Sequence, residues 1–202
     1  MRVASDVGGT FTDLVYYEYD EKTGEVGEIG TEKSDTTPPN FEEGVLNTIH
    51  RSDLKPADIS FFAHGTTVVI NALTERKGAK TGLITTKGFR DILEITRGNR
   101  PDIFNFYFSK PEPFVPRHLR REVEERTEYT GEILTQLKLG DLAAIVDDFK
   151  SEDVTAVAIC FLHSYANPEN EIRAAEELSS LWPEDSVVAS HRLSRQWPGY
   201  ER

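Results

Sequence analysis

The most constraining feature of the sequence is a pair of glycines, Gly8-Gly9, that separates two runs of β-forming residues near the start of the chain. Residues 2–9 and 11–19 are rich in Val, Phe and Tyr, so the pattern predicts two strands joined in a hairpin at the glycines. A third, more polar strand is expected at 25–33, near an edge of the same sheet.

One amphipathic helix is expected after these three strands. Asn40 and Glu43 form the pattern of an N-terminal helix cap, and apolar residues recur on one helical face as far as Ile49. The helix should end near Arg51. The first fifty residues therefore have the order strand, strand, strand, helix.

Strands and helices alternate in the rest of the chain, which predicts an α/β fold with parallel strands and right-handed crossovers. Strands are expected at 59–63, 79–86, 123–129, 154–163 and 186–193, and helices at 68–77, 87–95, 142–150 and 169–181. The strands at 59–63 and 79–86 are expected to extend the first sheet. Residues 97–121 contain four prolines and predict a long ordered loop whose aromatic side chains pack on another part of the protein.

The chain is expected to form two parts, a first lobe with a mixed sheet at 1–115 and a smaller α/β subdomain at 116–202. It ends directly after a strand, without a closing helix, so we expect it to be a piece of a longer protein.

Charge and composition exclude several classes of function. The net charge of −12 disfavours binding to nucleic acid or to an anionic membrane. The single cysteine, Cys160, rules out an internal disulfide and fits a cytoplasmic location. The patterns of a tightly bound zinc, of a Walker A loop and of a serine hydrolase are all absent from the sequence.

The octet DVGGTFTD, residues 6–13, has the chemistry of a phosphate site. Glycines let the backbone amides approach a phosphate closely, and they tolerate positive φ. The hydroxyl groups of Thr10 and Thr12 are further donors, and a carboxylate at the end of the first strand, Asp6, suits a hydrated Mg²⁺. A plain hairpin turn with solvated aspartates is the alternative for Gly8-Gly9 alone.

Two further groups of residues are candidates for a site. The turn expected at His64, Gly65, Thr66 and Thr67 precedes a helix, where Thr66 or Thr67 would cap free amides that stabilise an anion and His64 would act as acid or base. A capping threonine with a hydrogen-bonded histidine is the structural alternative. In the long loop, Arg97, Asn99 and Asp102 suit a small polar or carboxylate substrate, or they anchor the loop through salt bridges.

Several motifs together resemble the amino-terminal part of the hydantoinase A/oxoprolinase family. These motifs are DVGGTFTD, AHGTTVVINALTERKGAKTGLITTKGFRDILEI, RGNRPDIFNF, VEERTEY, AVAICFLHSYANPENE and the final YER, and they cover essentially the whole chain in order. The family includes ATP-dependent N-methylhydantoinase, 5-oxoprolinase and the carboxylases of acetone and acetophenone.

The resemblance implies an actin-like ATPase fold, related to ribonuclease H, with ATP and Mg²⁺ bound between two lobes. It also implies roles for residues of the first phosphate loop as nucleotide and metal contacts: Asp6, Gly8, Gly9, Thr10, Thr12 and Asp13. The second phosphate loop and the adenosine loop would lie beyond residue 202, so this piece alone is expected to be inactive. A second large subunit of the hydantoinase B type, or its fused equivalent, is the implied partner.

The implied activity is hydrolysis of a cyclic amide after ATP phosphorylates the amide oxygen, with His64, Thr66 and Thr67 assigned to the substrate side as a hypothesis. A ketone carboxylase subunit of the same family is an alternative. An actin-like kinase for a sugar or a carboxylate, and a non-catalytic module that uses nucleotide as a switch, would share the same phosphate loop.

Overall fold

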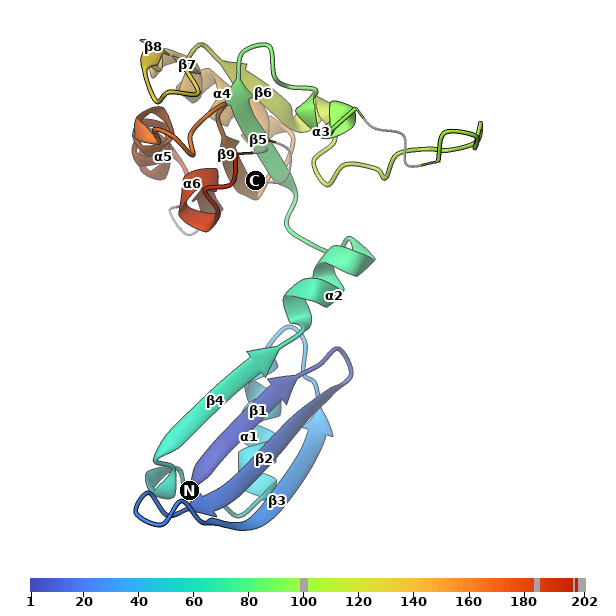
Figure 1. The fold of residues 1–202 in the computed structure, drawn as a ribbon, viewed down its shortest axis with the longest axis vertical. Coiled ribbons are helices and arrows are strands. Elements are labelled where there is room, and N and C mark those ends of the chain that lie inside the picture. Colours follow the sequence, from blue (N-terminus) through green and yellow to red (C-terminus); the bar gives the residue numbers. More distant parts are fainter. Residues whose placement is uncertain (99–101, 184–185, 198, 200–202) are drawn as a thin grey trace. The chain divides into compact units, whose positions relative to one another are not determined.

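The computed structural model describes residues 1–98, 102–183, 186–197 and 199. They form two compact units, Met1–Gly78 and Ala79–Arg202, and each unit is described by itself (Figure 1).

The first unit is a four-stranded mixed sheet with the strand order β3-β2-β1-β4. Strand β1 lies in the interior, antiparallel to β2 and parallel to β4, while β2 and β3 are antiparallel. Strands β3 and β4 form the two edges. The elements are β1 (Arg2–Val7), β2 (Phe11–Tyr19), β3 (Val26–Asp35), α1 (Phe41–Arg51), a 3₁₀ turn (Pro56–Asp58), β4 (Phe61–Thr66) and α2 (Val68–Glu75).

Helix α1 covers one face of this sheet (Figure 1). Val3 and Leu14 of the sheet pack with Ile49 of the helix, and the alternation along β1 buries Ser5 and Val7 on the same face. At Gly44 a side chain would not fit, because a Cβ there would lie 2.8 Å from Thr12 Oγ1. Helix and sheet are therefore in close contact at Thr12, near the Gly8-Gly9 turn.

The second unit contains a four-stranded parallel sheet with the order β10-β9-β5-β6 and a separate antiparallel pair, β7 and β8. The strands are β5 (Thr81–Thr86), β6 (Arg120–Val123), β7 (Arg126–Thr127), β8 (Ile133–Thr135), β9 (Ala156–Cys160) and β10 (Val187–Ala189). The helices are α3 (Ile92–Ile95), a 3₁₀ turn (Arg117–Leu119), α4 (Gly140–Ser151), α5 (Glu169–Leu181) and α6 (Ser190–Leu193).

Helices α4 and α5 cover one face of the parallel sheet. A Cβ at Gly82 of β5 would lie 2.6 Å from the Phe149 ring of α4, so the helix needs a glycine at this position. Ile84, Phe149, Val157 and Leu178 belong to the same buried core. This core is much larger than that of the first unit.

The structure confirms the predicted hairpin, the edge position of the third strand and helix α1, and it corrects the pairing of the strand at 79–86. This strand, β5, pairs with β6 and β9 in the second sheet and does not extend the first. The contacts accordingly divide the chain after Gly78, whereas the sequence had suggested a boundary between 115 and 116. A short apolar run indicates a strand but carries no information on which sheet it joins.

Local details also differ from the predictions. His64, Gly65 and Thr66 lie inside β4 and do not form a turn. Asn40 makes no side-chain cap bond to the backbone of α1; its amide instead donates to Glu43 Oε1 at 3.4 Å. The strand expected at 186–193 ends at Ala189, and α6 follows.

Three aromatic rings of the long loop lie on the surface of the second unit. Phe104 and Phe106 are each 86% exposed, and Tyr107 is 97% exposed. The expected packing of the loop's aromatic rings on another part of the protein stays a prediction.

Glu125 is a buried carboxyl in the second unit. Its Oε1 accepts a hydrogen bond from Thr86 Oγ1, and its Oε2 accepts one from Asn170 Nδ2 at 2.9 Å. Burial raises the pKa of Glu125 above the usual 4.5, against the lowering effect of the two hydrogen bonds. The folded protein therefore keeps this proton to a higher pH than the unfolded chain.

This difference predicts a pH dependence of stability. Below the unfolded pKa both states are protonated, and as pH rises through the raised pKa the folded state must ionise a buried group, so the free energy of unfolding falls. Glu125→Gln should flatten that fall above pH 4.5, measured by urea unfolding at each pH. Glu132→Gln, at an exposed position in the nearby turn, is the matched control. Parallel pH profiles for Glu125→Gln and the unmodified protein would contradict the assignment.

Candidate functional site

The loop between β1 and β2 is a tight turn that Thr36 stabilises through two hydrogen bonds. The Gly8 amide donates to the Phe11 carbonyl at 2.9 Å and closes the turn. The Thr36 amide donates to the Thr10 carbonyl at 2.9 Å, and Thr36 Oγ1 donates to the Gly8 carbonyl at 2.9 Å. In the described part of the chain, no group accepts a hydrogen bond from the Gly9 or Thr10 amide. The turn therefore presents the Gly9 and Thr10 amides as two hydrogen-bond donors whose positions are fixed by the surrounding hydrogen bonds.

Close contacts, and not an unusual φ, constrain the two glycines. Neither Gly8 nor Gly9 has a φ in the left-handed region. A Cβ on Gly8 would lie 3.0 Å from the Phe11 carbonyl oxygen, and a Cβ on Gly9 would lie 2.9 Å from Asn71 Nδ2. The Asn71 side chain of α2 is therefore packed directly against the turn.

The N-terminus of α2 lies beside this turn. Val7 is the register partner of Thr66, and the Thr67 amide donates to the Val7 carbonyl at 3.0 Å. Thr67 is the N-cap residue but makes no side-chain cap bond, and Thr66 Oγ1 instead accepts from the Val68 amide at 3.2 Å. The positive end of the helix dipole and the free amides of the turn therefore share one edge of the sheet.

Two carboxylates face each other on the open side of the sheet. Asp6 of β1 and Asp13 of β2 are directly opposite in the register, and Asp6 also lies opposite Gly65 of β4. Lys33 Nζ pairs with Asp13 Oδ1 at 3.1 Å, whereas no side chain of the described residues pairs with Asp6. Like charges directly across a strand pair repel, so the arrangement favours a further cation beside Asp6.

His64 lies on the other side of the sheet from Asp6. Its ring Nδ1 is 2.8 Å from Ser5 Oγ, on the buried face of β1, and Asp6 is the next residue along the strand. With Val7, Thr66 and apolar residues of α1, His64 lines a groove of about 550 Å³. The structure therefore separates the proposed acid–base group from the two carboxylates.

Sequence reasoning missed the three residues that complete this site, Lys33, Thr36 and Asn71. Thr36 follows directly after the strand that pairs with β2, which is the only signal in the sequence for its role. Asn71 lies one helical turn after Thr67, and its backbone amide donates to the Thr67 carbonyl. Nothing in the sequence connects Asn71 to Gly9. Thr12, predicted as a donor, is fully buried and is hydrogen-bonded with Thr36 Oγ1 at 3.2 Å.

The candidate substrate residues of the long loop belong to the second unit. Arg97 and Asp102 are exposed, and Asn99 lies outside the described residues. Among residues 1–98, 102–183, 186–197 and 199, no cluster of three or more metal-ligating side chains is found. None of the helices in these same ranges has the length and hydropathy of a membrane span.

Comparison with known proteins places these features in a family. The sequence model of the hydantoinase/oxoprolinase N-terminal region matches residues 2–181. An uncharacterized protein of Methanocaldococcus jannaschii is 38% identical over 100% of this chain and 29% of its own length. The alpha subunit of caprolactamase from Pseudomonas jessenii is 32% identical over 100% of this chain and 30% of its own length.

A solved structure has the same fold. The nucleotide-free structure of acetone carboxylase, from work on ATP-dependent acetone carboxylation, superposes with a TM-score of 0.77 and 26% identity, over 95% of this chain and 29% of that one. The chain thus spans about three-tenths of the length of each of these three proteins. The chain belongs to the hydantoinase/oxoprolinase family and corresponds to its N-terminal region.

Proposed function

We propose that the first unit binds the phosphates and the metal ion of ATP in an ATP-dependent enzyme that acts on a cyclic amide. The observation that carries the proposal is the pair of free amides at Gly9 and Thr10, fixed by Thr36 beside the N-terminus of α2. Converging amides and a helix N-terminus are the usual means by which a backbone binds phosphate. The names of the relatives, an ATP-dependent carboxylase among them, support this choice of anion.

The donor set on the open face fits Mg²⁺. This ion takes one or two carboxylates and keeps most of its waters, and Asp6 and Asp13 offer two carboxylates opposite each other. Asp6 would bind the ion, and Lys33 would hold Asp13 in place. When bound, Mg²⁺ would neutralise charge on the phosphates. The mixed sheet with the order β3-β2-β1-β4 supports an actin-like, ribonuclease H-like lobe.

The proposed reaction activates an amide, which is a poor electrophile. The γ-phosphoryl group passes from ATP to the carbonyl oxygen and ADP departs; water then adds to the carbon, and the C–N bond breaks with a proton passing to nitrogen. A second water releases phosphate from the acyl phosphate. The residues of the turn would bind and orient the phosphates, and Thr66 would keep the α2 amides aligned.

A ketone carboxylase subunit is the second candidate, favoured by the structural similarity to acetone carboxylase. Phosphorylation of a carbonyl oxygen would serve that reaction as well. Because one relative is named a subunit alpha, we propose that the complete protein works with a second large subunit. The location proposed for the protein is the cytoplasm.

The deciding experiment measures ADP release by the full-length protein with its partner subunit, with hydantoin, 5-oxoproline, caprolactam and acetone offered separately. Stimulation by a cyclic amide together with a ring-opened acid is expected. Stimulation by acetone alone would favour the carboxylase. A stable phosphorylated product would indicate a kinase, and nucleotide binding without stimulation by any compound would indicate a switch module.

Asp6→Asn tests the metal site in the full-length protein. Removing one carboxylate should raise the Mg²⁺ concentration for half-maximal ATP hydrolysis by about 10- to 100-fold. Asp20→Asn is the control, because Asp20 lies in the opposite hairpin turn, where its Oδ1 accepts from the Lys22 amide at 2.8 Å. An unchanged Mg²⁺ dependence in Asp6→Asn would refute the assignment.

His64→Ala tests the substrate-side role proposed for the groove. Since the His64 ring and the Asp6 carboxyl are on opposite faces, the dissociation constant of ATP should change by less than about twofold, while substrate-stimulated ATP hydrolysis falls by about 100-fold. His50→Ala, an exposed histidine of α1, should change neither quantity. The assignment fails if turnover is unchanged or if ATP affinity falls as far as turnover.

A further inference from the structure

The parallel sheet of the second unit has a topological switch point between β5 and β9. The chain passes from β5 through α3 to β6 on one side, and from β9 through α5 to β10 on the other. Connections that leave two adjacent parallel strands in opposite directions open a crevice at the carboxyl ends of the strands, where open α/β sheets bind ligands. The residues of this crevice belong to the second unit, whereas those of the phosphate loop belong to the first.

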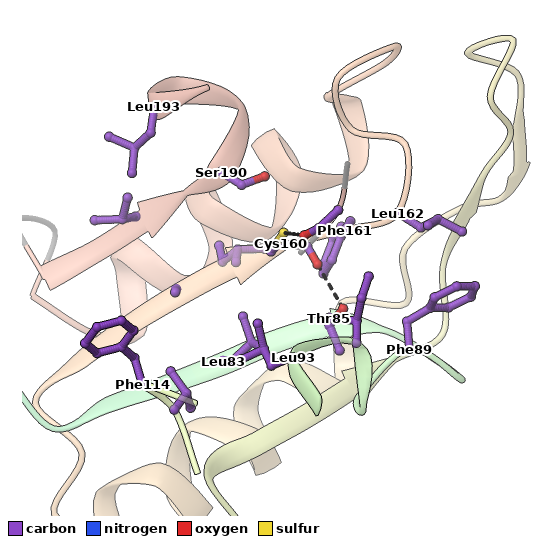
Figure 2. A pocket seen from close by; sticks show the side chains of 16 residues that line it. Leu83, Thr85, Phe89, Leu93, Phe114, Cys160, Phe161, Leu162, Ser190 and Leu193 are labelled. Atoms are coloured by element: carbon purple, nitrogen blue, oxygen red, sulfur yellow. Dashed lines mark hydrogen bonds between the residues drawn. The ribbon is translucent and has the colours of Figure 1, made fainter. Parts of the chain in front are cut away.

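A cavity of about 220 Å³ lies at this point (Figure 2). Leu83 and Thr85 of β5 and Ala158 and Cys160 of β9 line it, from the sheet face opposite to the one that Gly82 presents to Phe149. The other lining residues include Phe89 and Leu93 after β5, Phe114 before β6, Phe161 after β9, and Ser190 and Leu193 after β10. Val188 of β10 also lines it, so three strands contribute to one pocket.

The two hydroxyl groups that line the cavity both donate their protons to other groups of the protein. Thr85 Oγ1 donates to the Cys160 carbonyl at 2.9 Å, and Ser190 Oγ donates to Glu171 Oε1 at 2.7 Å. Each hydroxyl group therefore offers a ligand only lone pairs. Among the described residues, no charged side chain lines the cavity, and the neighbouring carboxyl group is that of Glu171, which accepts from Ser190. The chemistry suits a hydrogen-bond donor and disfavours an anion.

The size of the cavity sets the size of the ligand. A protein cavity of about 150 Å³ lined by Leu, Ile and Phe is enough to bind benzene. The larger cavity here has room for a six-membered ring with one small substituent.

We propose that this cavity is a binding site for a small, uncharged, mainly hydrocarbon ring that carries one hydrogen-bond donor, of the phenol or cyclohexanol class. The ring occupies the space between Leu83, Leu93 and Phe161, and its donor reaches the lone pairs of Thr85 or Ser190. The site is built only from residues of the second unit and does not rest on the proposed function.

The test uses ¹⁹F NMR of the full-length protein with three probes, 4-fluorophenol, fluorobenzene and 4-fluorobenzoate. Saturable binding of 4-fluorophenol is expected, with fluorobenzene weaker and 4-fluorobenzoate without detectable binding. Ala158→Leu, which fills the cavity from the sheet, should weaken the binding of 4-fluorophenol at least tenfold. Ala156→Leu, two residues earlier on the same strand and outside the lining, is the matched control and should bind as the unmodified protein does.

Thr85→Val provides a second variant that keeps the shape of the cavity. It should reduce the preference for 4-fluorophenol over fluorobenzene without abolishing the binding of either probe. Should Ala158→Leu fail to fold, Leu193→Glu, at an exposed position of the rim, should weaken the binding of both probes. The proposal is overturned if the folded protein binds neither neutral probe, or if a folded Ala158→Leu variant binds 4-fluorophenol unchanged.

Discussion

The pairing of β1 with both of its neighbours is the constraint on which the first unit depends. Its antiparallel pairing with β2 creates the Gly8-Gly9 turn, and its parallel pairing with β4 brings the start of α2 to the same edge. The same register sets Asp6 opposite Asp13 and turns His64 to the other face. One strand therefore decides both which groups meet at the site and which are kept apart.

The two units use the same arrangement with different chemistry. In each, the candidate site lies at the carboxyl ends of two adjacent parallel strands, β1 with β4 in the first unit and β5 with β9 in the second. The first sheet is amphipathic and exposes carboxylates, so its site suits phosphate and a cation. Strand β5 is buried along nearly its whole length, as is typical of parallel sheets, and the second site is a cavity with apolar walls.

Local patterns in the sequence predicted the elements whose signals are local. The hairpin, helix α1 and the alternation of strands and helices follow from β-propensity, from the 3.6-residue period and from glycine turns. The sheet to which β5 belongs depends on contacts with residues 120–123 and 156–160, and no short pattern contains that information. The same reason hid Thr36 and Asn71, which reach the turn from about 27 and 62 residues away in the chain only because the sheet folds.

Strand β4 carries a consequence for the behaviour of the protein in solution. Strand β4 is an edge strand, so one side of its backbone has unpaired donors and acceptors. Phe61 is 54% exposed and Phe62 is 42% exposed, so both faces of the strand also present apolar surface. Such an edge is a template for non-native pairing between molecules. In this chain, long-range repulsion from the net charge of −12 opposes such pairing, and salt screens that repulsion. Self-association of this chain is therefore expected to increase with ionic strength.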